Sequence, residues 1–243
     1  MLNKSEVKYI QSLKDKKSRD EHGVFVAEGP RIMADLLNDC PADIVSVYAL
    51  ESWMASQPGL PSGIQCHIVA DFELEKLSFM QTPQQVLAVV KKPSAGFVPF
   101  TKGEWHLLLD GIQDPGNLGT IIRTADWFGI KALYCTDDCA DCFNPKVVQA
   151  SMGSVPRIPV YYGDAAGWLA SAGIPVYGTL LNGSSIFSGP FEPGVIVIGS
   201  EGKGIRPAIE KLITQGITIP GRGKAESLNA AVAAGVVLAE LVR

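Results

Sequence analysis

Three short segments in the second half of the chain combine glycines with polar residues, each next to an apolar run that predicts a β-strand. They cover residues 114–123 (DPGNLGTIIR), 198–205 (IGSEGKGI) and 219–229 (IPGRGKAESLN). Open α/β sheets place their ligand sites at the carboxyl ends of strands. Glycine lets a backbone approach a ligand closely. The three segments therefore predict one composite ligand pocket on an α/β sheet.

Apolar runs alternate with helix-like stretches throughout this half of the chain. We expect strands at 105–109, 132–135, 157–161, 175–179, 195–198 and 217–219. We expect helices at 118–128, 145–152, 164–171, 206–214 and 227–242. This alternation predicts a largely parallel sheet that is covered by helices on both faces.

The first third of the chain contains short elements of both kinds, which predict a smaller α/β unit. We expect helices at 4–16, 31–37, 51–56 and 71–79, and strands at 23–27, 44–50, 65–69 and 86–90. Residues 91–103 are punctuated by Pro and Gly, which is typical of a linker. We therefore expect a first domain at 1–92, a linker at 93–103 and a second domain at 104–243.

The composition favours a globular protein with a substantial core, since 47% of its 243 residues are hydrophobic. The net charge of −4 is unusual for a generic nucleic-acid-binding protein, which is commonly basic. Any nucleic-acid contact is therefore expected in local patches, such as the lysine-rich residues 4–19. The N-terminus has no apolar leader, and the run 228–242 is short for a bilayer, so we expect a cytoplasmic protein without a membrane span.

The cysteines give little support for a metal site. Cys135, Cys139 and Cys142 are closely spaced, but this stretch contains no fourth thiol and no histidine. Structural zinc sites usually combine four such ligands. We therefore expect reduced thiols and no metal.

Asn117 and Arg123 are the two polar residues of interest in the first segment. Asn117 fits the N-cap of the predicted helix 118–128, which would be a purely structural role. Arg123 gains nothing from the helix dipole near an N-terminus, but it suits a phosphate or carboxylate ligand there. A surface ion pair with Asp110, Asp114 or Asp126 is the alternative for Arg123.

The other two segments contribute Glu201, Ser227 and Asn229. Glu201 stands between a strand end and two glycines, so a solvated side chain and a site residue are both possible. Ser227 fits the N-cap of the last helix, and Asn229 then has no capping role. The glycine order G-x-x-G-x-G differs from the dinucleotide fingerprint G-x-G-x-x-G, so it favours a Rossmann oxidoreductase only weakly.

Taken together, the three segments resemble the signature motifs of the SpoU (TrmH-like) family of RNA ribose 2′-O-methyltransferases, in the SPOUT class. The resemblance covers about residues 105–243, and the segment 143–153 is also similar. Residues 25–31 (FVAEGPR) resemble a small RNA-binding domain, related to a ribosomal-protein fold, that precedes many members. Gln149 and Cys142 depart from the pattern, which commonly has Arg and Pro there.

The resemblance implies a SPOUT domain with a parallel sheet and a C-terminal trefoil knot, preceded by a small α/β substrate-binding domain. It also implies a homodimer that uses S-adenosyl-L-methionine as cofactor. The expected cofactor-binding residues are Thr179, Leu180, Gly199, Ile219 and Leu228. The apolar last helix suits either the core or a subunit interface.

The resemblance further implies that Arg123, Asn117, Glu201, Ser227 and Asn229 form the catalytic site. A guanidinium has a pKa above about 12 and is a poor base. We therefore expect Arg123 to hold an RNA phosphate, Asn117 and Asn229 to orient the ribose and Arg123, and Glu201 to hold Arg123 or neighbouring N–H groups. Ser227 would contact the nucleotide or cap its helix.

The expected function is methylation of a ribose 2′-hydroxyl in structured RNA, with ribosomal RNA favoured over transfer RNA. A non-catalytic RNA-binding or ribosome-assembly factor is the alternative. Basic residues outside the motifs are candidates for RNA contact: Lys14, Lys16, Lys17, Arg19, Arg31 and Lys146, together with Arg157, Arg222 and Lys224.

Overall fold

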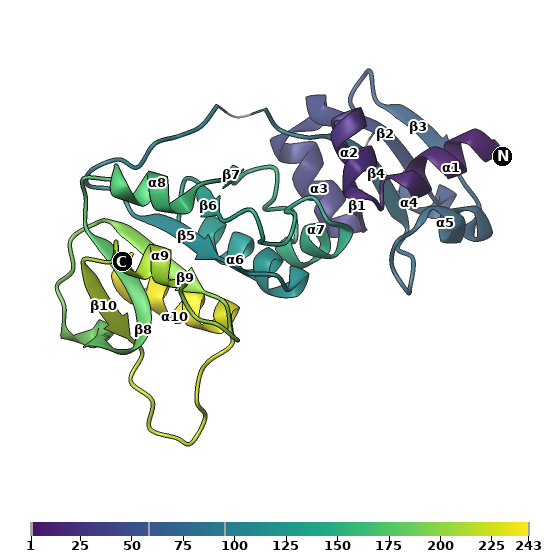
Figure 1. Cartoon of the computed structure of the whole chain (residues 1–243). Helices are drawn as coiled ribbons and strands as arrows, with labels where there is room; N and C mark the ends of the chain where they lie inside the picture. The colour runs from purple at the N-terminus through teal and green to yellow at the C-terminus, as the bar shows by residue number, and fades with distance from the viewer. Residues whose placement is uncertain (1, 58, 95, 243) are drawn as a thin grey trace. The chain divides into compact units, whose positions relative to one another are not determined.

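The computed structural model describes residues 2–57, 59–94 and 96–242, which form two compact units. Unit 1 comprises Met1–Ser94 with Asp141–Arg157, and unit 2 comprises Ala95–Ala140 with Ile158–Arg243. Residues 141–157, which the sequence assigns to the second domain, thus pack with the first part of the chain. Figure 1 shows the elements of both units.

Unit 1 contains a four-stranded mixed sheet in the order β1-β4-β2-β3. β4 pairs antiparallel with β1 and β2, and β2 pairs parallel with β3. The strands are β1 (Val24–Glu28), β2 (Ile44–Ala49), β3 (Gln65–Ile68) and β4 (Val86–Lys91). The helices are α1 (Lys4–Ser12), α2 (Lys16–His22), α3 (Pro30–Asp39), α4 (Glu51–Ala55), α5 (Asp71–Leu77), α7 (Pro145–Ser151) and the 3-10 turn η1 (Pro41–Asp43).

Both faces of this sheet are buried, as the alternation of β4 shows. Val86, Ala88 and Val90 face a core shared with α3, α4 and Val148 of α7. Leu87 and Val89 face a second core shared with α1 and α5. Because side chains alternate along a strand, an apolar run such as β4 supplies both cores.

One predicted helix of unit 1 is two helices in the structure. The expected helix 4–16 is broken into α1 and α2, and the N-cap of α2 is Asp15. α2 then ends at Gly23, whose φ of 64° is left-handed and marks a helix stop. The charged residues of this stretch gave one continuous polar pattern, which concealed the break.

Unit 2 contains a six-stranded parallel sheet in the order β10-β8-β9-β5-β6-β7. The strands are β5 (His106–Asp110), β6 (Leu133–Cys135), β7 (Val160–Tyr162), β8 (Val176–Ser185), β9 (Val195–Gly199) and β10 (Gln215–Thr218). The helices are α6 (Pro115–Trp127), α8 (Ala165–Ala170), α9 (Pro207–Glu210), α10 (Ala230–Leu241) and the 3-10 turn η2 (Ile186–Ser188). The expected parallel α/β sheet is confirmed.

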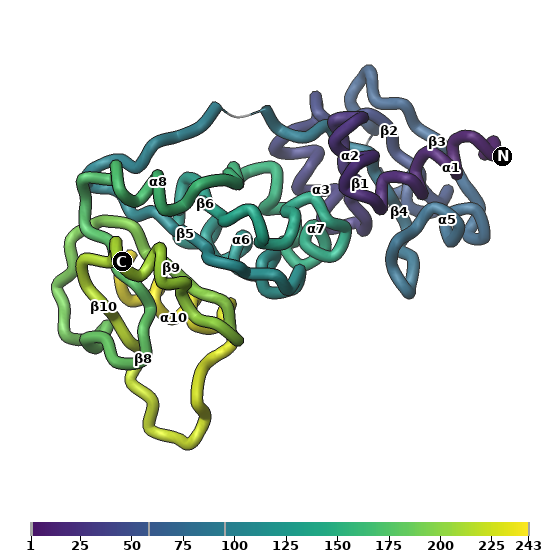
Figure 2. The backbone as a smooth tube through the Cα atoms, in the orientation of Figure 1, coloured from purple at the N-terminus to yellow at the C-terminus, as the bar shows by residue number. Residues whose placement is uncertain are grey.

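The central strands of this sheet are buried on both faces. Leu108, Val195 and Val197 share a core with α8 and α9. The alternate residues Leu107 and Ile196 are also fully buried, and α10 packs on β9 and on α6. The segment 219–229 leaves the edge strand β10 and forms an extended loop before α10 (Figure 2).

The Pro- and Gly-rich segment after Ser94 is held on unit 2 by aromatic side chains. Phe97 and Phe100 contact the ring of Tyr134, and the hydroxyl of Tyr134 donates to the carbonyl of Val98 over 2.7 Å. Burial raises the pKa of Tyr134 to about 12. The segment therefore has fixed contacts although its composition is that of a linker.

Candidate active site

Three side chains, one from each glycine-polar segment, meet at a single carboxylate oxygen. The side-chain amides of Asn117 and Asn229 donate to Oε1 of Glu201 over 2.8 and 2.6 Å. The backbone N–H of Ala230 donates to the same oxygen over 3.1 Å. Asn229 also donates to Oδ1 of Asn117 over 2.9 Å. Residues 112 positions apart in the chain thus form one hydrogen-bonded cluster.

The capping of α6 leaves the side chain of Asn117 available for this cluster. The sequence predicts Asn117 as the N-cap, and this is wrong: α6 begins at Pro115, and its N-cap is Asp114. The carboxylate of Asp114 accepts the backbone N–H of Asn117 over 2.8 Å. Pro115 occupies the first helical position, where its missing N–H costs nothing. Asn117 therefore uses its amide for Glu201.

The N-cap of the last helix lies two residues later than the sequence predicts. The N-cap of α10 is Asn229 and not Ser227. Oδ1 of Asn229 accepts from the N–H groups of Ala231 and Val232, while its amide nitrogen donates to Glu201. Ser227 is exposed and makes no hydrogen bond with any residue that the structure describes. One asparagine thus fixes both the helix start and the carboxylate.

Arg123 lies on the exposed face of α6. Its guanidinium forms no hydrogen bond or ion pair with any residue in the described ranges. The prediction that Glu201 holds Arg123 is therefore wrong for this structure, whereas the alternative prediction, that Glu201 holds a neighbouring N–H group, is met by Ala230. Arg123 is left with its full set of donors for an anionic ligand.

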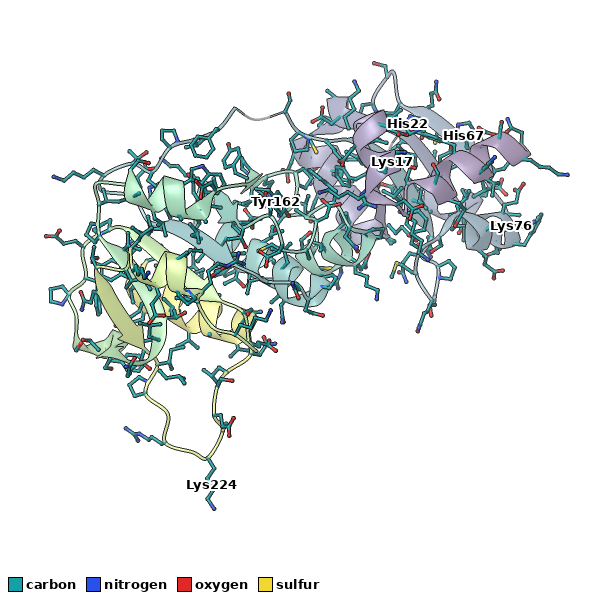
Figure 3. All side chains as sticks on the ribbon, in the orientation of Figure 1. Lys17, His22, His67, Lys76, Tyr162 and Lys224 are labelled. Carbon is teal, nitrogen blue, oxygen red and sulfur yellow. The ribbon has the colours of Figure 1, made fainter. Side chains whose placement is uncertain are left out.

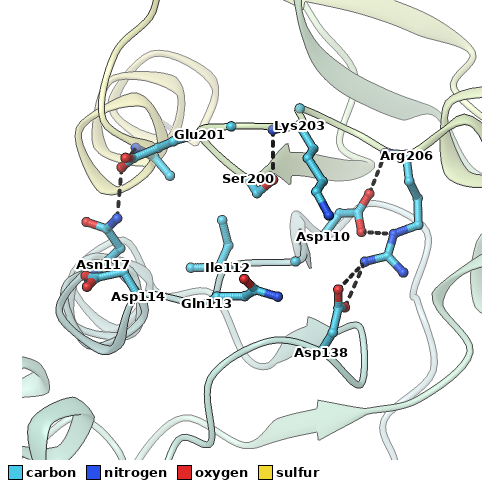
Figure 4. Close-up of a pocket in the computed structure, with 14 residues that line it drawn as sticks. Asp110, Ile112, Gln113, Asp114, Asn117, Asp138, Ser200, Glu201, Lys203 and Arg206 are labelled. Carbon is cyan, nitrogen blue, oxygen red and sulfur yellow. Dashed lines mark hydrogen bonds and ion pairs between the residues drawn. The ribbon is translucent and has the colours of Figure 1, made fainter.

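A pocket of about 490 Å³ opens beside the cluster, at the carboxyl ends of β5 and β9. Asn117 and Glu201 form one side of it, as Figure 4 shows. Arg206 stands on the other side and connects two carboxylates. Its Nε lies 2.5 Å from Oδ1 of Asp110, and its Nη2 donates to both oxygens of Asp138 over 2.7 and 2.8 Å.

The Arg206 contacts alter the titration of the groups involved. The pKa of Asp138 is lowered by a hydrogen bond from Thr136 and by Arg206. The pKa of Arg206 is raised, chiefly by its hydrogen bonds to Asp138. Sequence reasoning missed Asp138 and Arg206. The one available signal was Asp110, an acidic residue at the end of an apolar strand.

Four of the five expected cofactor residues lie on or directly after three adjacent strands. Thr179 and Leu180 are in β8, Gly199 ends β9 and Ile219 follows β10. A side chain at Gly199 would clash with the backbone of Gly204, 2.3 Å away, so the chain is closely packed there. Leu228, in contrast, is 45% exposed. None of these five residues lines the pocket.

The donor set fits S-adenosyl-L-methionine, which needs apolar contact and backbone groups more than charge. Leu180 and Ile219 are half-buried apolar residues, and the carboxyl ends of the parallel neighbours β8, β9 and β10 lie at the same edge of the sheet. Ligands of open α/β sheets bind outside this edge.

The basic residues that the sequence suggests for RNA contact differ in exposure. Lys14, Lys16, Lys17, Arg31 and Lys146 are exposed, and Lys224 stands at the tip of the loop 219–229 (Figure 3).

The prediction that Arg19 contacts RNA is wrong, because its side chain is buried, with 1% of the residue exposed. Its guanidinium donates to the carbonyls of Leu13 and Lys14 and pairs with Asp141 over 2.5 Å. Arg19 is thus a structural residue of unit 1 and is closed to RNA.

The described residues show neither a metal site nor a membrane-spanning helix. No group of three or more His, Cys, Asp or Glu among them is placed to hold a metal ion. No helix among them has the length and apolar character needed to cross a membrane.

The buried Cys139 accepts the N–H of Ile112 over 3.2 Å. Hydrogen bonding from Cys135 lowers the pKa of Cys139 to about 7.

Comparison with known proteins places this arrangement in a family. Residues 104–239 match the SpoU rRNA methylase family, and residues 4–88 match the MRM3-like substrate-binding domain. The chain is 34% identical over 240 residues to the 23S rRNA (guanosine(2553)-2′-O)-methyltransferase RlmP of Bacillus subtilis, covering 97% of this chain and 95% of that protein. The chain therefore belongs to the SpoU rRNA methylase family, as its motifs predict.

Solved structures agree with this assignment. A TrmH-family protein from Porphyromonas gingivalis superposes with a TM-score of 0.86 at 37% identity, covering 99% of this chain and 98% of that one. An rRNA methyltransferase from Sinorhizobium meliloti, solved with S-adenosyl-methionine bound, gives a TM-score of 0.84 at 30% identity, covering 99% and 95%. Both span the two units of the present chain.

Proposed function

We propose that this protein transfers a methyl group from S-adenosyl-L-methionine to the 2′-hydroxyl of a ribose in ribosomal RNA. The observation that supports this most directly is the Asn117–Glu201–Asn229 cluster, which joins the three family motifs at one edge of the sheet. The B. subtilis relative is named for this reaction on 23S rRNA, and it matches nearly the full length of both chains.

The cofactor supplies an electrophilic methyl group, so the protein has mainly to position the ribose and manage one proton. We propose that Oε2 of Glu201, which has no partner among the described residues, accepts a hydrogen bond from the 2′-hydroxyl. The N–H donors on Oε1 hold the carboxylate in place for this. Fixed positioning of reactants supplies a large part of many rate enhancements.

Arg123 binds the RNA phosphate next to the target ribose in this proposal. Its unpaired guanidinium supports the role, because planar donors suit phosphate oxygens. A cation at that place also stabilises the oxygen as its proton passes to a phosphate oxygen or to water. Ser227 is exposed and has no hydrogen-bond partner among the described residues, and it contacts the nucleotide when RNA is bound.

The cofactor is held by Thr179, Leu180, Gly199, Ile219 and Leu228. We further propose that the C-terminal segment threads a loop to form a trefoil knot. The contacts of α10 with β9, η2 and α6 support this threading. The protein works as a cytoplasmic homodimer, and the exposed apolar residues Trp127 on α6 and Val232 on α10 support an interface there.

Residues 1–92, against which residues 141–157 pack, act as the RNA substrate-binding domain, 93–103 connect it, and the rest of 104–243 forms the catalytic domain. The exposed residues Lys14, Lys16, Lys17, Arg31 and Lys146 contact the RNA backbone. Binding should therefore weaken as salt is raised.

The test is transfer of labelled methyl to RNA from cells that lack the protein, followed by mapping of the modified ribose. Arg123→Ala should reduce transfer below detection and leave cofactor affinity within about threefold, because Arg123 lies outside the expected cofactor loops. Lys131→Ala is the matched control, because it removes an exposed cation that pairs with Glu104, and it should retain activity. Full activity of Arg123→Ala would refute its role.

A further inference from the structure

The pocket lies between the Asn117–Glu201–Asn229 cluster and the ion pairs of Arg206. It contains polar groups that the proposed chemistry leaves unused. Lys203 reaches into it from the loop after β9, and Gln113 lines it from the loop after β5 (Figure 4). Neither side chain makes a hydrogen bond or an ion pair with any residue in the described parts of the chain. The hydroxyl of Ser200 accepts the N–H of Lys203 over 3.3 Å and keeps its own proton to donate.

The charges around the pocket argue against a phosphate as its occupant. Four carboxylates line it, those of Asp110, Asp114, Asp138 and Glu201, against the two cations Lys203 and Arg206. Arg206 is already shared between two of the carboxylates. An anion would meet a net negative wall, so a neutral ligand is favoured.

Apart from Oε2 of Glu201, which is assigned to the ribose, the free groups of the pocket include three hydrogen-bond donors. Arg206 holds Asp110 and Asp138, three N–H groups hold Oε1 of Glu201, and the free Oε2 of Glu201 is the acceptor assigned to the ribose. The ammonium of Lys203, the amide of Gln113 and the hydroxyl of Ser200 remain. A neutral ring with carbonyl oxygens matches this set, whereas an amino group facing Lys203 would put two donors together.

We propose that this pocket receives the base of the target nucleotide, unstacked from the RNA, and selects a base with a carbonyl at C6 of a purine or C4 of a pyrimidine, where adenine and cytosine carry an amino group: guanine or uracil rather than adenine or cytosine. This inference rests on the proposed function, since the ribose must lie at Glu201 for its base to enter. Lysine commonly reads O6 and N7 of guanine. Enzymes that act on one nucleotide often extrude it into such a pocket.

The geometry agrees with this assignment at both ends of the pocket. Asn117 and Glu201, the residues assigned to the ribose, form one wall, and Arg206 closes the opposite wall. Ile112 lies between them in the pocket lining (Figure 4). A volume of about 490 Å³ leaves room for a purine together with its sugar.

The experiment measures binding of four probes, the 5′-monophosphates of guanosine, uridine, adenosine and cytidine, by NMR titration of the cofactor-bound protein. The phosphate is common to all four, so differences report the base. Guanosine and uridine monophosphate should bind at least about fivefold more tightly than the other two. Lys203→Met and Gln113→Leu should each reduce this preference, and the double variant should abolish it.

Lys211→Met is the matched control, an exposed lysine that does not line the pocket, and it should leave the preference unchanged. Equal binding of all four probes, or an unchanged preference in the Lys203→Met, Gln113→Leu double variant, would overturn the inference. Base preference without methyl transfer to RNA would support the pocket and refute the enzyme. Methyl transfer to RNA without base preference would support the enzyme and refute the role of the pocket.

Discussion

Glu201 is the residue on which the three motifs converge, since one of its oxygens accepts three N–H groups. Glu201→Ala removes this common acceptor, so Asn117 and Asn229 lose their fixed orientation. We expect the single-turnover rate of methyl transfer to fall by about a hundredfold or more, the typical cost of misplacing a reacting group. Cofactor affinity should change little.

The matched control for this variant is Glu210→Ala, which removes an exposed carboxylate from α9. It should have the wild-type rate. A Glu201→Ala enzyme within about threefold of the wild-type rate would show that the cluster does not position the ribose.

Arg19 is a second residue whose role is set by burial. Arg19→Met would leave Asp141, which is only 14% exposed at its side chain, without its cation. Breaking a buried ion pair from one side typically costs about 3–5 kcal/mol. We expect a destabilisation of that order in denaturant unfolding monitored by circular dichroism.

Lys17→Met is the control, because Lys17 and Glu21 form an exposed pair at 3.8 Å. Its effect should stay below about 0.5 kcal/mol. A similar stability of both variants would contradict the structural role of Arg19.

At the scale of elements, α6 depends on its N-cap Asp114, which also leaves the side chain of Asn117 available for the site. Asp114→Ala should destabilise the protein by about 1 kcal/mol, since it removes the acceptor for the N–H of Asn117. For a chain of this size we expect a decrease in Tm of about 2–4 °C in a thermal scan. Asp114→Asn retains an acceptor and should lie near the wild type, and an equal loss in both variants would exclude capping as the cause.

The same helix shows what local sequence can and cannot predict about an element. The pattern of Leu118, Ile121, Ile122 and Ala125 predicted a helix at the right place. Asp114 and Asn117 are both good caps, so local preference could not decide between them. The contact that decides is Glu201, 84 residues away from Asn117. The start of α10 was misplaced for the same reason, because Asn229 and Ser227 both qualify as caps.

At the scale of the molecule, Glu28 links stability to pH. It is 5% exposed and accepts hydrogen bonds from Ser78 and from the N–H of Phe79. Burial raises the pKa of Glu28 above its usual 4.5 despite these bonds. A raised pKa in the folded state means that folding favours the protonated form, so the stability from this group is lost as pH rises through that pKa.

We therefore compare wild type with Glu28→Gln across the range from about pH 7 to about pH 4.5. The unfolding free energy of the wild type should increase relative to the variant as pH falls. Glu75→Gln, an exposed site on α5, should show no such trend. A difference between wild type and Glu28→Gln that does not change with pH would contradict the linkage.

The strand-helix alternation sufficed to predict the parallel sheet of unit 2, because buried parallel strands are apolar runs with clear ends. The six-strand order could not be read in the same way, since it depends on pairings such as that of β5 with β9, about 90 residues apart. In the site, too, local sequence identified some residues, and long-range pairing was needed for the others. Asn117, Glu201 and Asn229 were suggested by motif, whereas Asp138 and Arg206 have no local signal and are recognisable only once β5, β6 and β9 lie together.

Residues 141–157 limit how this protein could be divided into fragments or could exchange its first domain. The chain passes between the units three times, after Ser94, after Ala140 and after Arg157. Phe143 and Val148 in this excursion pack against Phe25 and the core beside β1. A fragment cut at the Pro- and Gly-rich segment would carry this apolar surface uncovered. Exchanging the first 94 residues for another recognition module would therefore require matching changes in a stretch of chain that lies nearly fifty residues further along.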